Sequence, residues 1–221
     1  INSYNANMVA NEVFIDSATL RENVVALAKN IGYTPKSRKA SRCIIDFFVD
    51  LDDVPSSPPS VTLKAGPVAA STNQFGNQSY VFNVLEDTTV PVFDSRAVFE
   101  NLEVIEGTKV TQSFTYSSQN PLQRFVLSNP GIDTDTILVQ VKPTDTSTIK
   151  VKYDLTNSLI DSKVNDVING SSTIYFLQEV EDERYEIIFG DGIFGRALND
   201  GNVIEVSYLV CDGPNANRVS Q

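Results

Sequence analysis

Hydrophobic and polar positions alternate with a period of two along most of this chain, which is the pattern of half-buried β-strands. Turn residues separate these runs at the short, even spacing typical of a sandwich or barrel. The pattern therefore predicts a mainly antiparallel β body over residues 61–221. The predicted strands are residues 61–64, 80–85, 97–105, 108–116, 123–127, 137–142, 148–153, 173–178, 185–189 and 204–210.

A further alternating run lies ahead of this body, at residues 42–51. Ile45 and Phe47 lie on one face of it and Ile44 and Phe48 on the other, so we expect both faces to be at least partly covered. A proline-rich stretch follows it, and its prolines cannot join a central ladder. Residues 37–60 are therefore predicted to form a strand and a linker.

The N-terminal residues follow a period of 3.6 instead of two. An apolar stripe lies between two helix boundary signals. A T-x-x-E capping box that begins at residue 19 marks the start of the helix, and a Gly-x-x-Pro stop that begins at residue 32 marks its end. This pattern predicts a helical arm over residues 1–36, with a packing surface that could meet either the β body or another chain. A second short helix is predicted over residues 156–168. The stripe consists of Leu20, Val24, Leu27 and Ile31.

The C-terminal part is dense in turn signals. Glycine and aspartate recur at residues 190–192, 199–201 and 212–213, and we expect glycine wherever the backbone needs a positive φ. Together with the flanking strands, these turns predict a glycine-rich β-meander. The fold class expected for the whole chain is α+β, with a helical arm followed by the β body.

Charge and cysteine content limit the choice of partner and compartment. Seventeen basic and 28 acidic residues give a net charge of −11, which argues against nucleic acid or an anionic membrane as a partner. No apolar run approaches the ~20 residues of a membrane span, so no membrane insertion is expected. Cys43 and Cys211 are either buried free thiols in a reducing compartment or a disulfide.

The residue inventory excludes several kinds of catalytic site. The chain has no histidine and only two cysteines, so it lacks nucleophile triads with histidine and a four-ligand structural zinc site. Asp191 and the residues 133–135 suggest calcium, but turn capping explains them better because no calcium loop surrounds them. We therefore expect no enzymatic activity, no cofactor and no metal.

Two segments resemble one family of structural proteins. Residues 185–217 resemble the F-G-D-G-x-x-G…G-x-x-I-x-V-x-Y…G…N signature of baseplate J-like proteins, the wedge subunits of contractile phage tails. Residues 7–37 resemble a segment of the large baseplate wedge proteins of T-even-like myophages. Arg218 departs from the pattern, since the family commonly has glycine there. The signature positions are Phe189, Gly190, Asp191, Gly192, Gly195, Gly201, Tyr208, Gly213 and Asn217.

This resemblance implies a structural role without catalysis. It implies a virion tail baseplate, assembled in the host cytoplasm, in which the chain pairs with itself as a dimer or higher oligomer and binds neighbouring wedge proteins. It also implies that the sequence is a central fragment of a longer protein. Two alternatives remain open: a β-sandwich module that binds carbohydrate or a receptor, which an exposed cluster of Phe75, Tyr80 and Phe82 would favour, and a hydrolase with paired carboxylates.

Overall fold

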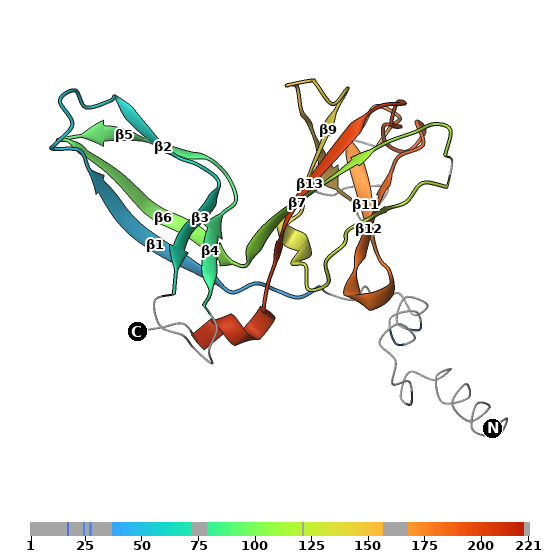
Figure 1. The fold of residues 1–221 in the computed structure, drawn as a ribbon, viewed down its shortest axis with the longest axis horizontal. Coiled ribbons are helices and arrows are strands. Elements are labelled where there is room, and N and C mark those ends of the chain that lie inside the picture. The colour runs from blue at the N-terminus through green and yellow to red at the C-terminus, as the bar shows by residue number, and fades with distance from the viewer. Residues whose placement is uncertain are drawn as a thin grey trace.

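The protein consists of two β-sheets joined end to end in a computed structural model that describes residues 37–71, 79–120, 122–156 and 168–218, together with Ser17, Val24 and Leu27. Figure 1 shows the first sheet as a long curved tongue and the second as a rounded, barrel-like body. A single residue, Gly107, separates the last strand of the tongue from the first strand of the barrel.

The tongue is a six-stranded sheet arranged around its longest strand, β6. β1 pairs with one edge of β6, while β5 and β4 pair with the other edge near its two ends, and β2 and β3 extend the sheet outward. A small core that includes Val84, Leu102 and Val104 fills the inner face. The strands are β1 (Arg42–Asp50), β2 (Ser60–Leu63), β3 (Gly66–Ala70), β4 (Val81–Val84), β5 (Thr88–Phe93) and β6 (Arg96–Glu106).

A bulge in β6 keeps this inner face continuous. The pairing of β1 with β6 shifts between Ile45 and Phe47, so that β6 gains an extra residue there. Asn101 takes a φ of 55° in the bulge and donates its backbone N–H to the Asp46 carboxylate at 2.6 Å. Phe99 and Leu102, on either side of the bulge, therefore both remain buried on the inner face.

The outer face of the tongue is open to solvent. Ile44 is 67% exposed and Phe48 57% exposed, while Ile45 and Phe47 on the inner face are half-buried. The expectation that both faces of this strand are covered is therefore wrong for the outer face. The alternation correctly predicts which apolar residues share a face, but only the inner face of the sheet has a core.

The barrel is a seven-stranded sheet in the order β7-β13-β9-β10-β11-β12-β8. Neighbouring strands are antiparallel except for β10 and β11. Gln112 on β7 reaches the far end of the order, because its side chain donates to the Val126 carbonyl at 3.3 Å and accepts the Ser128 N–H at 3.0 Å. These bonds nearly close the barrel. Its strands are β7 (Thr108–Thr115), β8 (Phe125–Val126), β9 (Leu138–Lys142), β10 (Val151–Leu155), β11 (Ile174–Glu179), β12 (Tyr185–Phe189) and β13 (Val203–Val210).

Val24 and Leu27 are helical, and the helices of the described residues from 37 onward are short 3₁₀ turns. They are η1 (Thr134–Thr136), η2 (Glu181–Glu183) and η3 (Gly213–Arg218), and none is long or apolar enough to cross a membrane. The expected α+β class is wrong, because the described chain is almost entirely β and contains no helix of seven or more residues. The predicted arm and its apolar stripe lie outside the described residues, apart from Ser17, Val24 and Leu27, and so does the interior of the predicted second helix.

The predicted β-meander is also wrong. β12 lies between β11 and β8, whereas β13 lies between β7 and β9, so the two strands do not pair. The turn residues between them form a connection across one end of the barrel instead of a hairpin (Figure 1). Local turn signals specify the conformation of a loop, but they do not determine which strands become neighbours.

Candidate functional site

The glycine-rich loop after β12 is anchored by its own backbone. Gly192 donates its N–H to the Gly195 carbonyl at 3.0 Å, which closes the turn. Gly195 donates to the Asn169 carbonyl at 3.1 Å, and Arg196 donates to the Ser172 carbonyl at 2.8 Å. The loop is thus fastened to the turn that precedes β11, which makes it an ordered feature of this end of the barrel.

Asp191 caps this turn. Its Oδ1 accepts the N–H groups of Phe194 and Ile193, both at 2.9 Å, and these bonds hold the pKa of the Asp191 carboxyl below its usual value. This is the turn-capping role that the sequence favours over calcium binding. In the described part of the chain, no group of three or more histidine, cysteine, aspartate or glutamate side chains could hold a metal.

The glycines of the loop have two different physical roles. Gly192, Gly195 and Gly201 have positive φ values of 91°, 84° and 79°, as the turn signals predict. Gly190 does not, so the positive-φ explanation is wrong for it. A Cβ there would lie 2.4 Å from the carbonyl oxygens of Phe194 and Gly195, and glycine is needed because the backbones approach so closely.

The tip of the loop presents apolar side chains to solvent. Ile193 is 69% exposed and Phe194 48% exposed. The backbone N–H groups of both residues are held by Asp191, so the tip offers a partner mainly apolar surface on an ordered frame. Two apolar residues between glycines were the sequence signal for this surface, and the sequence reasoning missed it.

A hollow of about 510 Å³ lies beside the loop. Among the residues lining it are two carboxylates, Glu186 and Asp191. Arg124 binds Glu186 through two bonds of 2.8 and 2.6 Å, which lowers the pKa of the Glu186 carboxyl. Both acids are therefore kept ionised by fixed partners, and the hollow lacks the protonated acid that a carboxylate hydrolase requires.

Of the remaining signature residues, Phe189 lines this hollow, whereas Tyr208 and Gly213 do not. Phe189 packs edge-on against Phe125 and Tyr153 in the barrel core, with ring centroids 5.7 and 5.4 Å apart. The buried Tyr208 donates its hydroxyl to Asn129 at 2.9 Å, and burial raises the pKa of this phenol. The final two, Gly213 and Asn217, lie in η3 after β13. The signature is thus spread along the barrel and supports its fold.

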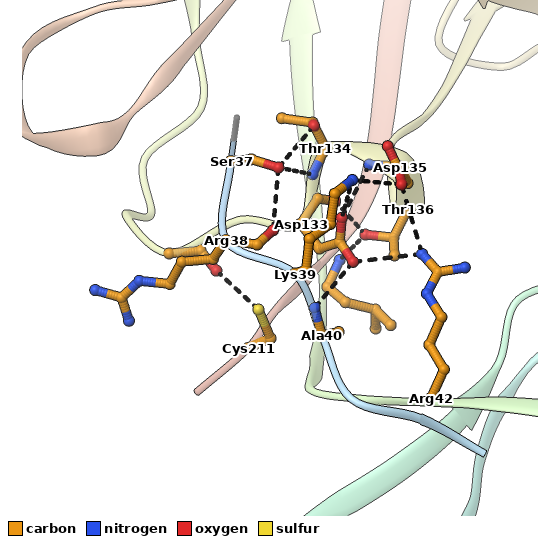
Figure 2. Close-up of polar contacts among 12 residues, drawn as sticks. Ser37, Arg38, Lys39, Ala40, Arg42, Asp133, Thr134, Asp135, Thr136 and Cys211 are labelled. Atoms are coloured by element: carbon orange, nitrogen blue, oxygen red, sulfur yellow. Dashed lines mark hydrogen bonds and ion pairs between the residues drawn. The ribbon is translucent and has the colours of Figure 1, made fainter. Parts of the chain in front are cut away.

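A second cluster of functional groups lies where the tongue meets the barrel, and its centre is Asp133. The side chain of Asp133 is fully buried. Its Oδ2 accepts the Ala40 N–H at 3.1 Å, and its Oδ1 accepts the Asp135 N–H at 3.1 Å (Figure 2). Lys39 Nζ and Arg42 Nη2 lie 3.5 and 3.4 Å from the carboxylate. This carboxylate therefore fixes the segment that leads into β1 onto the barrel.

Neighbouring hydroxyl groups reinforce the same attachment. Thr136 donates its hydroxyl to the Asp133 carbonyl at 2.7 Å and accepts the Leu209 N–H at 3.0 Å. Ser37 Oγ accepts the Thr134 N–H at 3.2 Å (Figure 2). A small apolar cluster that includes Ile105 and Leu209 fills the space between the two sheets. The junction is therefore a packed interface, not a flexible linker.

Glu106 is the unusual group of this junction. It is 3% exposed, its Oε1 accepts the Asp212 N–H at 3.4 Å, and its Oε2 has no hydrogen-bond partner. Burial raises the pKa of Glu106 to about 7; the bond from Asp212 opposes this rise and the charge of Asp212 adds to it. Glu106 does not line the hollow beside the glycine-rich loop, and its side chain is enclosed at the junction.

The two cysteines are free, so the structure contains no disulfide between them. Cys211 is buried at the junction, as the free-thiol interpretation expects, and burial raises the pKa of its thiol. Cys43 is also a free thiol, but it is exposed, so the expected burial is wrong for it.

The aromatic cluster that would favour a carbohydrate- or receptor-binding module does not form an exposed platform. Tyr80 is 4% exposed and Phe82 is half-buried against the tongue core, while Phe75 lies outside the described residues. The aromatic side chains that the structure does expose are elsewhere, at Phe48, Phe93 and Phe194.

Comparison with known proteins gives no assignment. No known protein family matches this chain, and no curated protein matches it. The sequence reasoning missed Glu106 and the structural role of Asp133, because no local pattern marks a residue whose partners are distant in sequence.

Proposed function

We propose that this protein is a structural, non-catalytic part of a contractile phage tail baseplate, in which it binds itself and neighbouring wedge proteins. The observation that carries the proposal is the glycine-rich loop. Its backbone and its carboxylate are engaged inside the loop, and Ile193 and Phe194 remain exposed at its tip. Such a loop is suited to contact another protein and offers no free group for chemistry.

The chemical inventory supports the same proposal. The chain has no histidine, and the two carboxylates beside the loop are held ionised by Arg124 and by backbone N–H groups. Among the described residues, the carboxyl group of Glu106 has a near-neutral pKa, and it is enclosed at the junction. These features favour a role in assembly over a role in proton transfer.

The junction gives a mechanical reason for the proposal. Asp133, Thr136 and the apolar cluster between the sheets join the tongue and the barrel through several independent contacts. A force or displacement applied to the tongue is thereby transmitted to the barrel. This is a useful property in a subunit that holds its neighbours in a ring.

The proposal is tested by binding to purified neighbouring wedge proteins. A chain with Ile193→Asp and Phe194→Asp should keep its fold and lose most of its binding, because two charges replace the apolar tip. The matched control is Ile149→Asp, since Ile149 is 68% exposed in a different loop and should leave binding unchanged. Equal binding by the tip variant and the native chain would contradict the role given to the loop.

A further inference from the structure

β1 has an open edge. Among the described residues it pairs only with β6, and its nine residues make it one of the longer strands of the molecule. An open edge presents a row of unpaired N–H and C=O groups, which can pair with another strand. β1 also exposes Ile44 and Phe48 on its outer face, so the edge and the apolar face form one surface.

The hydrogen bonds at the two ends of β1 show which backbone groups face outward. Glu106 donates to the Ser41 carbonyl at 2.8 Å, and Leu51 donates to the Ser95 carbonyl at 2.7 Å. Along an antiparallel strand, successive residues direct their backbone N–H and C=O groups to opposite edges in turn. The extra residue of the bulge lies in β6, so this alternation is unbroken in β1. The outward groups therefore belong to Arg42, Ile44, Asp46, Phe48 and Asp50.

These outward residues are complementary to a second copy of themselves. If two β1 strands pair antiparallel with Asp46 at the centre, Arg42 of each copy lies opposite Asp50 of the other, and Ile44 lies opposite Phe48. The pairing joins opposite charges at both ends and apolar side chains between them, and it uses all nine residues of the strand.

We infer that two copies of this chain associate through β1, forming a continuous sheet across a two-fold axis centred on Asp46. The association brings Ile44 and Phe48 of the two copies into cross-strand contact, and it is isologous because the same surface serves both partners. This inference concerns only how two copies of the chain pair through β1, and it does not depend on a role in a baseplate.

The centre of this interface carries a penalty. Two Asp46 carboxylates face each other across the axis, and like charges directly opposite on paired strands are destabilising. The bond from the Asn101 N–H holds each carboxylate toward β6, which leaves the pairing possible but weak. Asp46→Asn should therefore tighten the dimer, by up to about fivefold in Kd.

Sedimentation equilibrium of residues 1–221 over a range of concentrations tests the association. The native chain should show a reversible monomer–dimer equilibrium, and Asp50→Lys should weaken it because a lysine then faces Arg42 of the other copy. Asp53→Lys is the matched control, since it makes the same charge change in the exposed loop beyond the strand. A native chain that stays monomeric, or equal effects of the two variants, would overturn the inference.

The register is tested separately by cross-linking. Asp46→Cys in a Cys43→Ser background places one thiol from each copy at the two-fold axis, where paired strands hold Cα atoms about 5.5 Å apart, within disulfide range. A mild oxidant should convert this variant rapidly into a covalent dimer, and Asp53→Cys in the same background should react much more slowly. Equal rates, or dimers only from the control, would overturn pairing centred on Asp46.

Discussion

Gly190 and Gly201 both occupy turn signals, but the fold needs them for different reasons. A Cβ at Gly190 would collide with the backbone of Phe194 and Gly195, whereas a Cβ at Gly201 would meet nothing within 4 Å. At Gly201 only the positive φ of 79° disfavours a side chain. The sequence pattern marks the two positions alike, because it registers the turn and not the packing around it.

Alanine substitutions separate these two causes. Gly190→Ala should lower the free energy of unfolding by about 3 kcal/mol, because the backbone must move to accept the new carbon. Gly201→Ala should lower it by only about 1 kcal/mol, the cost of a left-handed conformation. Urea unfolding of both variants measures the difference, and equal losses would show that Gly190 is not closely packed.

Glu106 makes the stability of the protein depend on pH. Its pKa rises from an ordinary value of 4.5 to about 7 in the folded state, so the folded state binds more protons between these values. The contribution of Glu106 to the free energy of unfolding should therefore be largest below pH 4.5. It should fall as the pH rises toward 7 and stay constant above pH 7. The loss is roughly 3 kcal/mol.

Glu106→Gln tests this dependence, because glutamine keeps the oxygen that accepts the Asp212 N–H and cannot ionise. The variant should be more stable than the native chain at pH 8 and should lose most of the slope between pH 4.5 and 7. Urea unfolding at several pH values measures both effects. An unchanged slope would mean that Glu106 ionises normally in the folded protein.

At the scale of the elements, Asp133 holds the segment before β1 against η1 and the barrel. Asp133→Ala should destabilise the protein by about 3 kcal/mol, because the buried N–H of Ala40 and the partly buried N–H of Asp135 lose their acceptor. Asp135→Ala, a control at a side chain that is 58% exposed, should cost less than about 1 kcal/mol.

Hydrogen exchange gives a local measurement of the same contact. The Ala40 amide should exchange much faster in Asp133→Ala than in the native chain, while amides in the centre of β13 change little. If Ala40 stays protected in the variant, the attachment of this segment depends on other contacts.

The sequence predicted most strands because their alternation is local. It missed β3 and β5, which contain Pro67 and Pro91, since proline is normally excluded from central strands. The sheet tolerates both prolines because the strand pairing around them is irregular or short. Pro67 precedes a register shift against β4, and Pro91 pairs with Ser60 at the start of β2.

The sequence could not predict the partners of these strands or the junction. The separation of β12 from β13 depends on the whole barrel order, which turn residues do not encode. Asp133 lies 93 residues from its partner Ala40, so no short pattern connects them. The glycine-rich loop was predictable as a turn, and two apolar residues between its glycines were a missed signal for the exposed tip.

At the scale of the whole molecule, tongue and barrel are held together by protein groups. No cluster of metal ligands occurs in the described ranges of the chain, and Asp191 is occupied by backbone N–H groups. Adding a chelator should therefore leave the thermal unfolding temperature unchanged. Differential scanning calorimetry with and without EDTA measures this, and a fall of several degrees would make Asp191 and Asp133 the first residues to examine.

The mass of the chain in solution, alone and mixed with neighbouring wedge proteins, tests the central claim of an assembly role most directly. Light scattering after size-exclusion chromatography should give a discrete complex of fixed stoichiometry when the wedge partners are present. The claim is contradicted if the chain elutes at its own mass with every neighbouring protein and instead binds a carbohydrate or another small ligand.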